Sequence, residues 1–178
     1  SKAEPYLRRA LKRITRLNHT PYDGDVHYLL GLCCFYQGKL EAAYDWFRKG
    51  EWDGDKAAAC AYFAAALKAR QGDYPTALAH AEKALERNPK HSRAFGLMAA
   101  LLEAMGQEEA AGNRLETLLA QDPFDPLAGL PEGEAAADRL HKQAACLEAA
   151  ACYMEWGFYE KAARILESAP AGPLPLYY

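Results

Sequence analysis

The chain has 178 residues, of which 51% are hydrophobic and 25% charged, and its net charge at pH 7 is −3. Alanine and leucine, both strong helix formers, occur 36 and 23 times, whereas valine occurs once and isoleucine twice. Because sheets favour β-branched residues, this composition excludes a β-sandwich, a barrel and a parallel-sheet enzyme. The charge gives no signature of nucleic-acid binding, and no apolar run approaches the roughly 20 residues of a membrane span.

The first predicted helix covers Tyr6–Asn18, where apolar side chains recur at helical spacing. The same spacing recurs 33 residues later, so residues 1–20 are interpreted as the second helix of a truncated repeat unit, or alternatively as a capping helix. Residues 1–20 carry a net charge of +5, and the remaining 158 residues carry −8. This basic face is interpreted first as solvated, second as a docking surface for an acidic neighbour, and third as a nucleic-acid contact.

Three windows of 34 residues, 24–57, 58–91 and 92–125, align without a gap. A fourth copy, 143–176, follows after a 17-residue insertion at 126–142. We expect the insertion to begin with a loop. Glu134 then starts a first helix that continues into the fourth copy as far as Glu155 and is about 33 Å long. A tolerated surface loop is the first interpretation of the insertion, and a binding face is the second. The aligned columns hold Gly31, Ala65, Ala99 and Ala150; Gly38, Gly72, Gly106 and Gly157; Ala43, Ala77, Ala111 and Ala162; and Phe47, Ala81, Leu115 and Leu166.

These columns have physical reasons. A glycine ends a helix at low cost because it adopts the left-handed conformation freely, and Asp73 is placed to cap the helix after Gly72. Proline stops the second helix of a unit, as at Pro89 and Pro123. Small side chains allow two antiparallel helices to approach closely. Each unit is therefore predicted to be helix–turn–helix, and units stack because neither helix pair can bury its apolar face alone.

The pattern resembles the tetratricopeptide repeat over about residues 22–170. Period, small columns, turn glycine and closing proline match, although the bulky residue expected early in each first helix is matched well only by Phe95. The resemblance implies an all-α fold: an antiparallel helix–turn–helix solenoid with a right-handed superhelix, about four units long, after one extra helix.

No motif for catalysis or metal binding is found. The five histidines have no ligand spacing, and a calcium loop starting at Asp23 or Asp53 would need a glutamate at its twelfth position, where Cys34 and Ala64 stand. The Asp-Gly-Asp segments are therefore predicted to cap helices. The five cysteines have no CxxC spacing and are predicted to be reduced core thiols. We expect no enzyme activity, no cofactor and a cytoplasmic location, with a bacterial periplasm as the alternative.

The resemblance also implies a concave groove lined by the first helix of each unit. The groove columns are occupied here by Tyr28, Phe35, Tyr36, Tyr62, Arg70, Arg93, Leu147 and Met154, and packing between units is an equal alternative for the tyrosines. Gly96 interrupts one row. The carboxylate clamp of chaperone-binding members is absent, because its columns hold Tyr28, Leu32, Phe63 and Ala66.

These observations predict a non-catalytic scaffold that binds a peptide or partner segment, and truncated repeat ends could also pair two copies as a homodimer. A narrower resemblance is to the C-terminal repeat region of large bacterial proteins with a β-rich N-terminal domain, which implies an accessory or dimerisation domain of a carbohydrate-active protein as the alternative. It is based on Tyr22–Asp23–Gly24, Leu29–Leu30–Gly31, Glu51–Trp52–Asp53–Gly54, Asn88–Pro89, Asp122–Pro123 and Tyr177–Tyr178.

Overall fold

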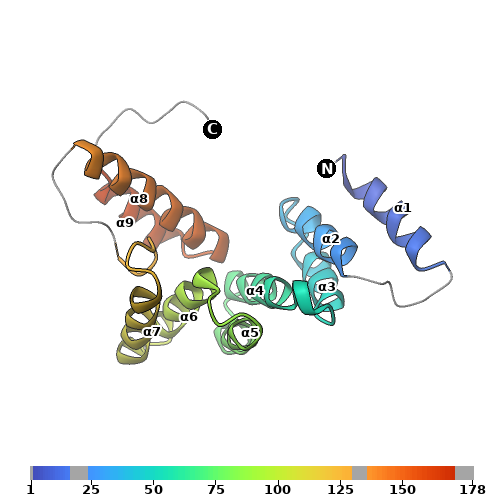
Figure 1. Ribbon diagram of the computed structural model, residues 1–178, viewed down its shortest axis with the longest axis horizontal. Coiled ribbons are helices and arrows are strands. Elements are labelled where there is room, and N and C mark those ends of the chain that lie inside the picture. The colour runs from blue at the N-terminus through green and yellow to red at the C-terminus, as the bar shows by residue number, and fades with distance from the viewer. Residues whose placement is uncertain (1, 17–23, 130–135, 171–178) are drawn as a thin grey trace. The chain divides into compact units, whose positions relative to one another are not determined.

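The computed structural model describes residues 2–16, 24–129 and 136–170, and it describes side chains in 2–16, 24–129 and 141–170 (Figure 1). All regular secondary structure in these ranges is helical. By contacts the chain forms two compact units, Ser1–Ala94 and Phe95–Tyr178. The helices are α1 Glu4–Ile14, α2 Asp25–Phe35, α3 Leu40–Gly50, α4 Gly54–Arg70, α5 Tyr74–Arg87, α6 Ser92–Ala104, α7 Glu108–Gln121, α8 Ala136–Trp156 and α9 Tyr159–Ser168.

The predicted all-α repeat fold is confirmed, whereas the division at 24–57, 58–91, 92–125 and 143–176 stays a prediction. The first helix begins at Glu4 and ends at Ile14, four residues short of the predicted end, and Asn18 lies outside the described residues. The predicted helix from Glu134 to Glu155 corresponds to α8, which has 21 residues and ends at Trp156. Glu134 also lies outside the described part of the chain. Among the described helices, none is both long enough and apolar enough to cross a lipid bilayer.

Four turns between paired helices share one geometry, as the glycine column predicts. The turn glycines have φ of 72°, 77°, 74° and 88° at Gly38, Gly72, Gly106 and Gly157. In each turn the glycine N–H and the next N–H bond back to the preceding helix; Gly38 donates to Phe35 at 3.0 Å and Lys39 donates to Cys34 at 2.9 Å. These two hydrogen bonds supply donors to carbonyl groups in the last turn of the helix that would otherwise be unpaired.

The core of the first unit is built around a glycine. Phe47 is fully buried, and its ring stacks on Phe63 with centroids 4.9 Å apart. A Cβ on Gly31 would lie 2.5 Å from Phe47 Cε1, so α2 and α3 approach this closely only because position 31 carries no side chain. Gly31 therefore leaves the space that the Phe47 ring fills.

Asp53 connects two consecutive first helices. Its Oδ1 accepts the N–H of Asp55 at the start of α4 at 3.1 Å, and its Oδ2 accepts the N–H of Gly24 before α2 at 2.6 Å. A Cβ on Gly24 would meet Asp53 Cβ at 2.7 Å. The capping role predicted for this Asp-Gly-Asp segment is thus confirmed, and the same carboxylate also fixes the start of the preceding unit. The other predicted cap, at Asp23, lies outside the described residues.

The start of the insertion differs from a plain surface loop. Asp125 is buried, and its carboxylate accepts the N–H of Leu127 at 2.8 Å. Leu127 is also buried, and its Cδ1 lies 2.7 Å from where a Cβ on Gly96 would be. Gly96 is therefore the packing seat of Leu127. The gap that it leaves in the predicted groove row has a structural cause within the second unit.

Candidate protein-interaction surface

The eight predicted groove residues are divided between the units and are described separately. The first unit holds Tyr28, Phe35, Tyr36, Tyr62, Arg70 and Arg93, and the second holds Leu147 and Met154. Their surroundings differ widely: some belong to the packed interior, and others are open to solvent. Only the exposed members can contact a partner directly without rearrangement.

Tyr28 and Phe35 belong mainly to the core of the first unit. The Tyr28 ring lies 6.1 Å from the rings of both Phe47 and Phe63, and Phe35 lies edge-on to Phe63 at 5.5 Å. Phe35 is 5% exposed and Tyr28 is partly exposed. These aromatic side chains hold the helices together, which is the packing alternative considered for the tyrosines.

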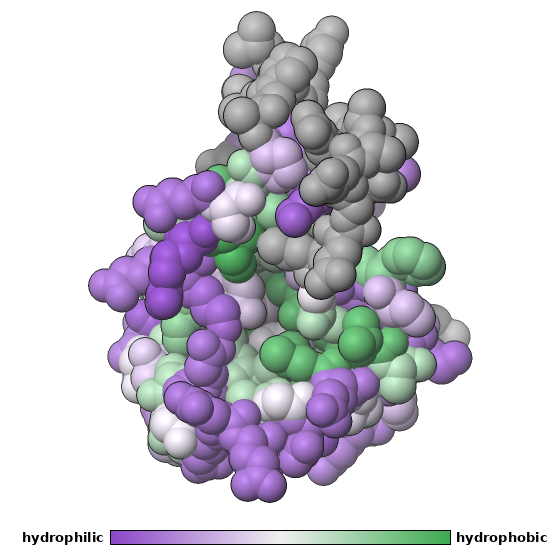
Figure 2. All heavy atoms as spheres, turned by 90° about the vertical axis from the view of Figure 1, so that its left-hand side faces the viewer, coloured by the Kyte–Doolittle hydropathy of each residue, from purple (hydrophilic) through white to green (hydrophobic). Residues whose placement is uncertain are grey.

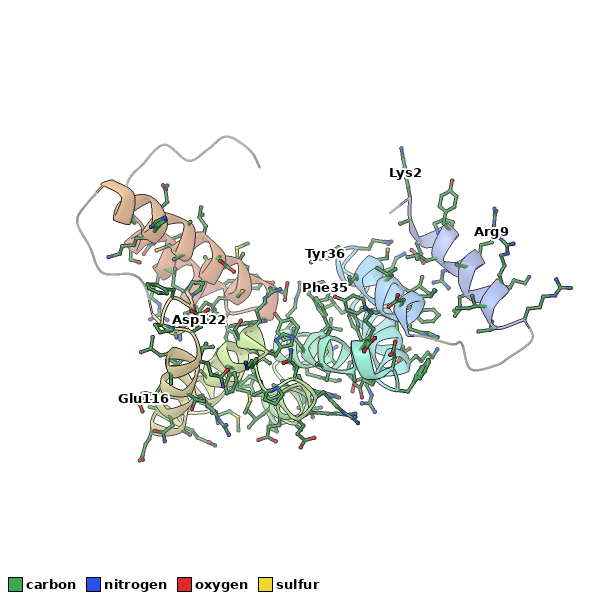
Figure 3. The ribbon with its side chains drawn as sticks, viewed as in Figure 1. Lys2, Arg9, Phe35, Tyr36, Glu116 and Asp122 are labelled. Atoms are coloured by element: carbon green, nitrogen blue, oxygen red, sulfur yellow. The ribbon has the colours of Figure 1, made fainter. Side chains whose placement is uncertain are left out.

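Tyr36 is the most exposed aromatic residue of the predicted set, and Arg70 contacts the same supporting ring. Tyr36 is 74% exposed, follows α2 directly and meets Phe35 edge-on at 5.4 Å (Figure 3). Arg70, at the last position of α4, places its guanidinium 5.5 Å from the centroid of the same Phe35 ring. Buried Phe35 thus supports an exposed tyrosine and a half-buried arginine, and we call these three residues the Tyr36–Arg70 surface.

Tyr62 is buried and therefore not accessible to a partner. It is 1% exposed, and its ring packs against Phe63 at 5.1 Å and His91 at 4.9 Å. The Arg93 guanidinium lies 5.3 Å from the Tyr62 centroid, so a cation–π contact occupies the remaining ring face. Burial lowers the pKa of His91, which favours the neutral imidazole beside Arg93. Tyr62 therefore fixes the start of α6.

The second unit presents a narrow apolar stripe on α8. Leu147 is 38% exposed and Met154 50% exposed, and Ala144 and Ala151 on the same helix are also exposed. These positions are three or four residues apart, so they share one face of the helix. Figure 2 views the molecule from the side of α7 to α9 and shows hydrophobic side chains at the surface among hydrophilic ones. Leu147 and Met154 are accessible, as a partner contact requires.

A groove that the sequence interpretation missed lies between α1 and α2. Apolar side chains line both walls, and its volume is about 680 Å³. The signal was present: the α2 members recur at helical spacing on the side away from Leu30 and Cys34, so α2 is apolar on two faces. The lining residues are Ala3, Tyr6, Leu7, Leu29, Leu32, Cys33, Tyr36 and Gln37.

Glu4 fixes the α1 wall of this groove. Its carboxylate accepts hydrogen bonds from Arg8 at 3.0 Å, Gln37 at 3.2 Å and Lys39 at 3.2 Å. These donors, Arg8 foremost, lower the pKa of Glu4 to about 2. Arg8 also lies 5.8 Å from the Trp46 ring centroid on α3. The start of α1 is therefore tied to the turn after α2.

A polar cluster joins α3 to α5. The buried Glu51 carboxylate pairs with Arg48 at 2.7 Å and with Lys83, and its Oε1 lies 4.0 Å from His80 Nδ1. His80 Nε2 forms a hydrogen bond with the Tyr44 hydroxyl at 3.0 Å. Burial lowers the pKa of His80 despite the neighbouring carboxylate. We interpret the cluster as a structural contact between second helices, because Arg48, Lys83 and Tyr44 pair with groups inside the cluster.

The thiols do not have the surroundings of nucleophiles. Cys34, Cys60, Cys146 and Cys152 are buried, and none of the five cysteines forms a disulfide. Burial raises the pKa of Cys60 to about 12 and also raises that of Cys34 and Cys146. Four of the five predicted core thiols are therefore buried, whereas Cys33 is partly exposed and lines the α1–α2 groove. Within the described ranges, no three histidine, cysteine or carboxylate side chains gather as a metal site would require.

The helix pairs and their repeated glycine caps define an all-α helical-repeat protein. A family model described as Tetratricopeptide repeat matches residues 68–130, and another, described as Anaphase-promoting complex, cyclosome, subunit 3, matches residues 1–84. Residues 68–130 therefore match the tetratricopeptide repeat family, as the aligned columns suggested. These matches do not support an accessory domain of a carbohydrate-active protein.

Solved structures with similar folds cover most of the chain. A tetratricopeptide repeat protein from Parabacteroides merdae ATCC 43184 is 18% identical, with a TM-score of 0.60 over 93% of this chain and 70% of that chain. A structure of MamA is 15% identical, with a TM-score of 0.57 over 90% and 83%. MamA 41-end from Desulfovibrio magneticus RS-1 is 17% identical, with a TM-score of 0.53 over 84% and 94%. At these identities the similarity establishes the fold.

Proposed function

We propose that this chain is a non-catalytic scaffold that binds a segment of a partner protein through exposed side chains of its first helices. The observation that carries the proposal is the Tyr36–Arg70 surface, where a tyrosine that is 74% exposed and an arginine lie on one buried ring. Tyrosine and arginine are enriched among the residues that dominate binding energy, and a rigid support reduces the entropy lost on binding.

The predicted groove residues then divide by role. Tyr36 and Arg70 contact the partner, whereas Phe35, Tyr28 and Tyr62 hold the helices that position them. Leu147 and Met154 offer a second, apolar contact on α8. A partner segment with an aliphatic or aromatic side chain next to a carboxylate suits the first of these surfaces, because Arg70 pairs well with carboxylates.

The test uses a photo-crosslinking amino acid in place of Tyr36, in cell lysate, with the same reagent in place of Trp52 as the matched control. Trp52 is 48% exposed and precedes the start of α4, about 25 Å along the helix from Arg70. A protein that crosslinks from position 36 but not from position 52 would then be purified. Its affinity for the unmodified chain would be measured by calorimetry.

A Tyr36→Ala/Arg70→Ala variant should weaken that affinity by about 30-fold or more, because two such side chains at a hot spot cost about 2 kcal/mol or more. Trp52→Ala should leave the affinity unchanged. Circular dichroism shows whether each variant keeps its helices. Equal affinity of the double variant and the unmodified chain would refute the assignment of this surface.

A further inference from the structure

The α1–α2 groove combines an apolar floor with a positively charged border. Tyr6 is 72% exposed and Leu29 43% exposed, so the apolar walls are open to solvent. Tyr6 also lines an adjoining hollow with Lys2, Pro5 and Arg9. Figure 3 shows Lys2 and Arg9 extending outward from α1. A ligand for this site needs a bulky apolar side chain with carboxylates beside it.

The second unit carries a surface of that chemistry. Phe124, in the turn after α7, is 84% exposed, more than any other large hydrophobic residue in the described part of the chain. Leu119 on α7 is 43% exposed. Both side chains are therefore accessible to a second molecule.

Carboxylates lie next to these apolar side chains. Glu116 precedes Leu119 by three positions and therefore shares its helix face. Asp122 accepts the N–H of Phe124 at 3.0 Å, which fixes the turn and holds the carboxylate next to the backbone of Phe124. Both acids are exposed, and Figure 3 shows Glu116 pointing outward from α7. From residue 108 to residue 125 the chain has five carboxylates and one arginine.

The geometry points to self-association: Phe124 and Leu119 of one copy dock in the α1–α2 groove of a second copy, with Glu116 and Asp122 facing Lys2 and Arg9. The two surfaces carry opposite charges, and the apolar side chains on one meet an apolar groove on the other. A volume of about 680 Å³ falls within the range of sites that hold side chains or small ligands.

This contact joins two different surfaces, so each copy keeps one groove and one Phe124 turn unoccupied. Such a heterologous contact adds copies head to tail and produces rings or open chains instead of a symmetric dimer. Ion pairs at its border make the association weaker at high salt, because salt screens exposed charges. The inference concerns surfaces other than Arg70, and its test is independent of partner capture.

The experiment measures the mass of the full chain by sedimentation velocity and light scattering, from micromolar to millimolar concentration, at low and high salt. We expect mass to increase with concentration and to fall with added salt. Phe124→Ala should weaken the association by about 10- to 100-fold, as for a central anchor. Tyr159→Ala, a change at an aromatic residue that is 57% exposed on α9, is the matched control and should have no effect.

A charge exchange identifies the two surfaces. One variant reverses the groove border with Lys2→Glu/Arg9→Glu, and the other changes the docking turn with Glu116→Lys/Asp122→Asn. Asparagine retains the acceptor for the Phe124 N–H. Each variant alone should remain monomeric. An equimolar mixture should associate again, because the groove variant keeps an unmodified docking turn and the turn variant keeps an unmodified groove.

A chain that stays monomeric at every concentration refutes the proposal. So does association that persists in Phe124→Ala and in both charge variants, because another surface must then be responsible. Failure of the mixture to associate, with both variants folded by circular dichroism, would also overturn it. Docking of Phe124 in the groove of its own copy would show no change in mass with concentration and counts as refutation.

Discussion

Replacing Gly31 with alanine tests whether a glycine is required at this position to make room for the Phe47 ring. Alanine is the better helix former by about 1 kcal/mol, so α2 alone would gain stability. The new methyl carbon, however, would lie 2.5, 2.6 and 2.9 Å from three atoms of the Phe47 ring. Phe47 cannot move away easily, because it is fully buried and stacked on Phe63.

The magnitude follows from the balance of these effects. Overpacking a filled core costs about 1–3 kcal/mol, and a clash with three ring atoms belongs at the upper end. Subtracting the helix-propensity gain leaves a net loss of about 2 kcal/mol, which corresponds to a fall of about 4–8 °C in melting temperature. A Gly31→Ala/Phe47→Leu variant removes ring atoms and should lose less stability than the two single changes added together.

Gly112 supplies the matched control. It lies within α7, is exposed, and a Cβ there would meet nothing within 4 Å. Gly112→Ala should therefore raise stability by about 0.5–1 kcal/mol. Urea unfolding followed by circular dichroism measures both variants. If Gly31→Ala is as stable as the unmodified chain or more stable, Phe47 does not require a glycine at position 31 and the interpretation is wrong.

Three further predictions concern single side chains. Burial lowers the pKa of His80 below the ordinary histidine value of 6.5, so just below that pH the unfolded chain binds a proton that the folded chain does not. Urea midpoints should therefore decrease as pH falls through 6.5, and a His80→Gln variant should show a shallower decrease. Buried Cys60, with its pKa near 12, should resist a thiol reagent in the folded chain, whereas partly exposed Cys33 should react first; mass spectrometry of the labelled peptides distinguishes them. Asp53→Ala should lower the free energy of unfolding by about 1–2 kcal/mol through loss of the α4 cap, and Asp53→Asn should retain most of it.

The sequence predicted the features whose causes are local. A positive φ at Gly38 follows from the conformational freedom of glycine, and the cap at Asp53 follows from a carboxylate placed before a helix. These local patterns recur every 34 residues, so the same turn or cap residue is found at the equivalent position of several units. The helix pairs and their turns could therefore be predicted from spacing alone.

The accessibility of individual groove residues could not be predicted in this way. Tyr28 and Tyr62 belong to the same predicted row, yet Tyr62 is 1% exposed because Arg93 and His91 cover it from outside its own helix. Gly96 leaves a gap in that row because Leu127, from a segment outside the 34-residue period, fills the space. Column position determines which way a side chain points, whereas residues distant in sequence determine whether it is covered.

Tyr36 links the two proposed surfaces, because it lines the α1–α2 groove and also adjoins Phe35 and Arg70. One exposed ring cannot be covered by a partner segment and by Phe124 of a second copy at the same time. Adding a purified partner should therefore lower the mass of the self-associated chain, and Arg70→Ala, which weakens only partner binding, should remove this effect. If mass is unchanged at saturating partner, the two surfaces do not share Tyr36, and binding and self-association are independent.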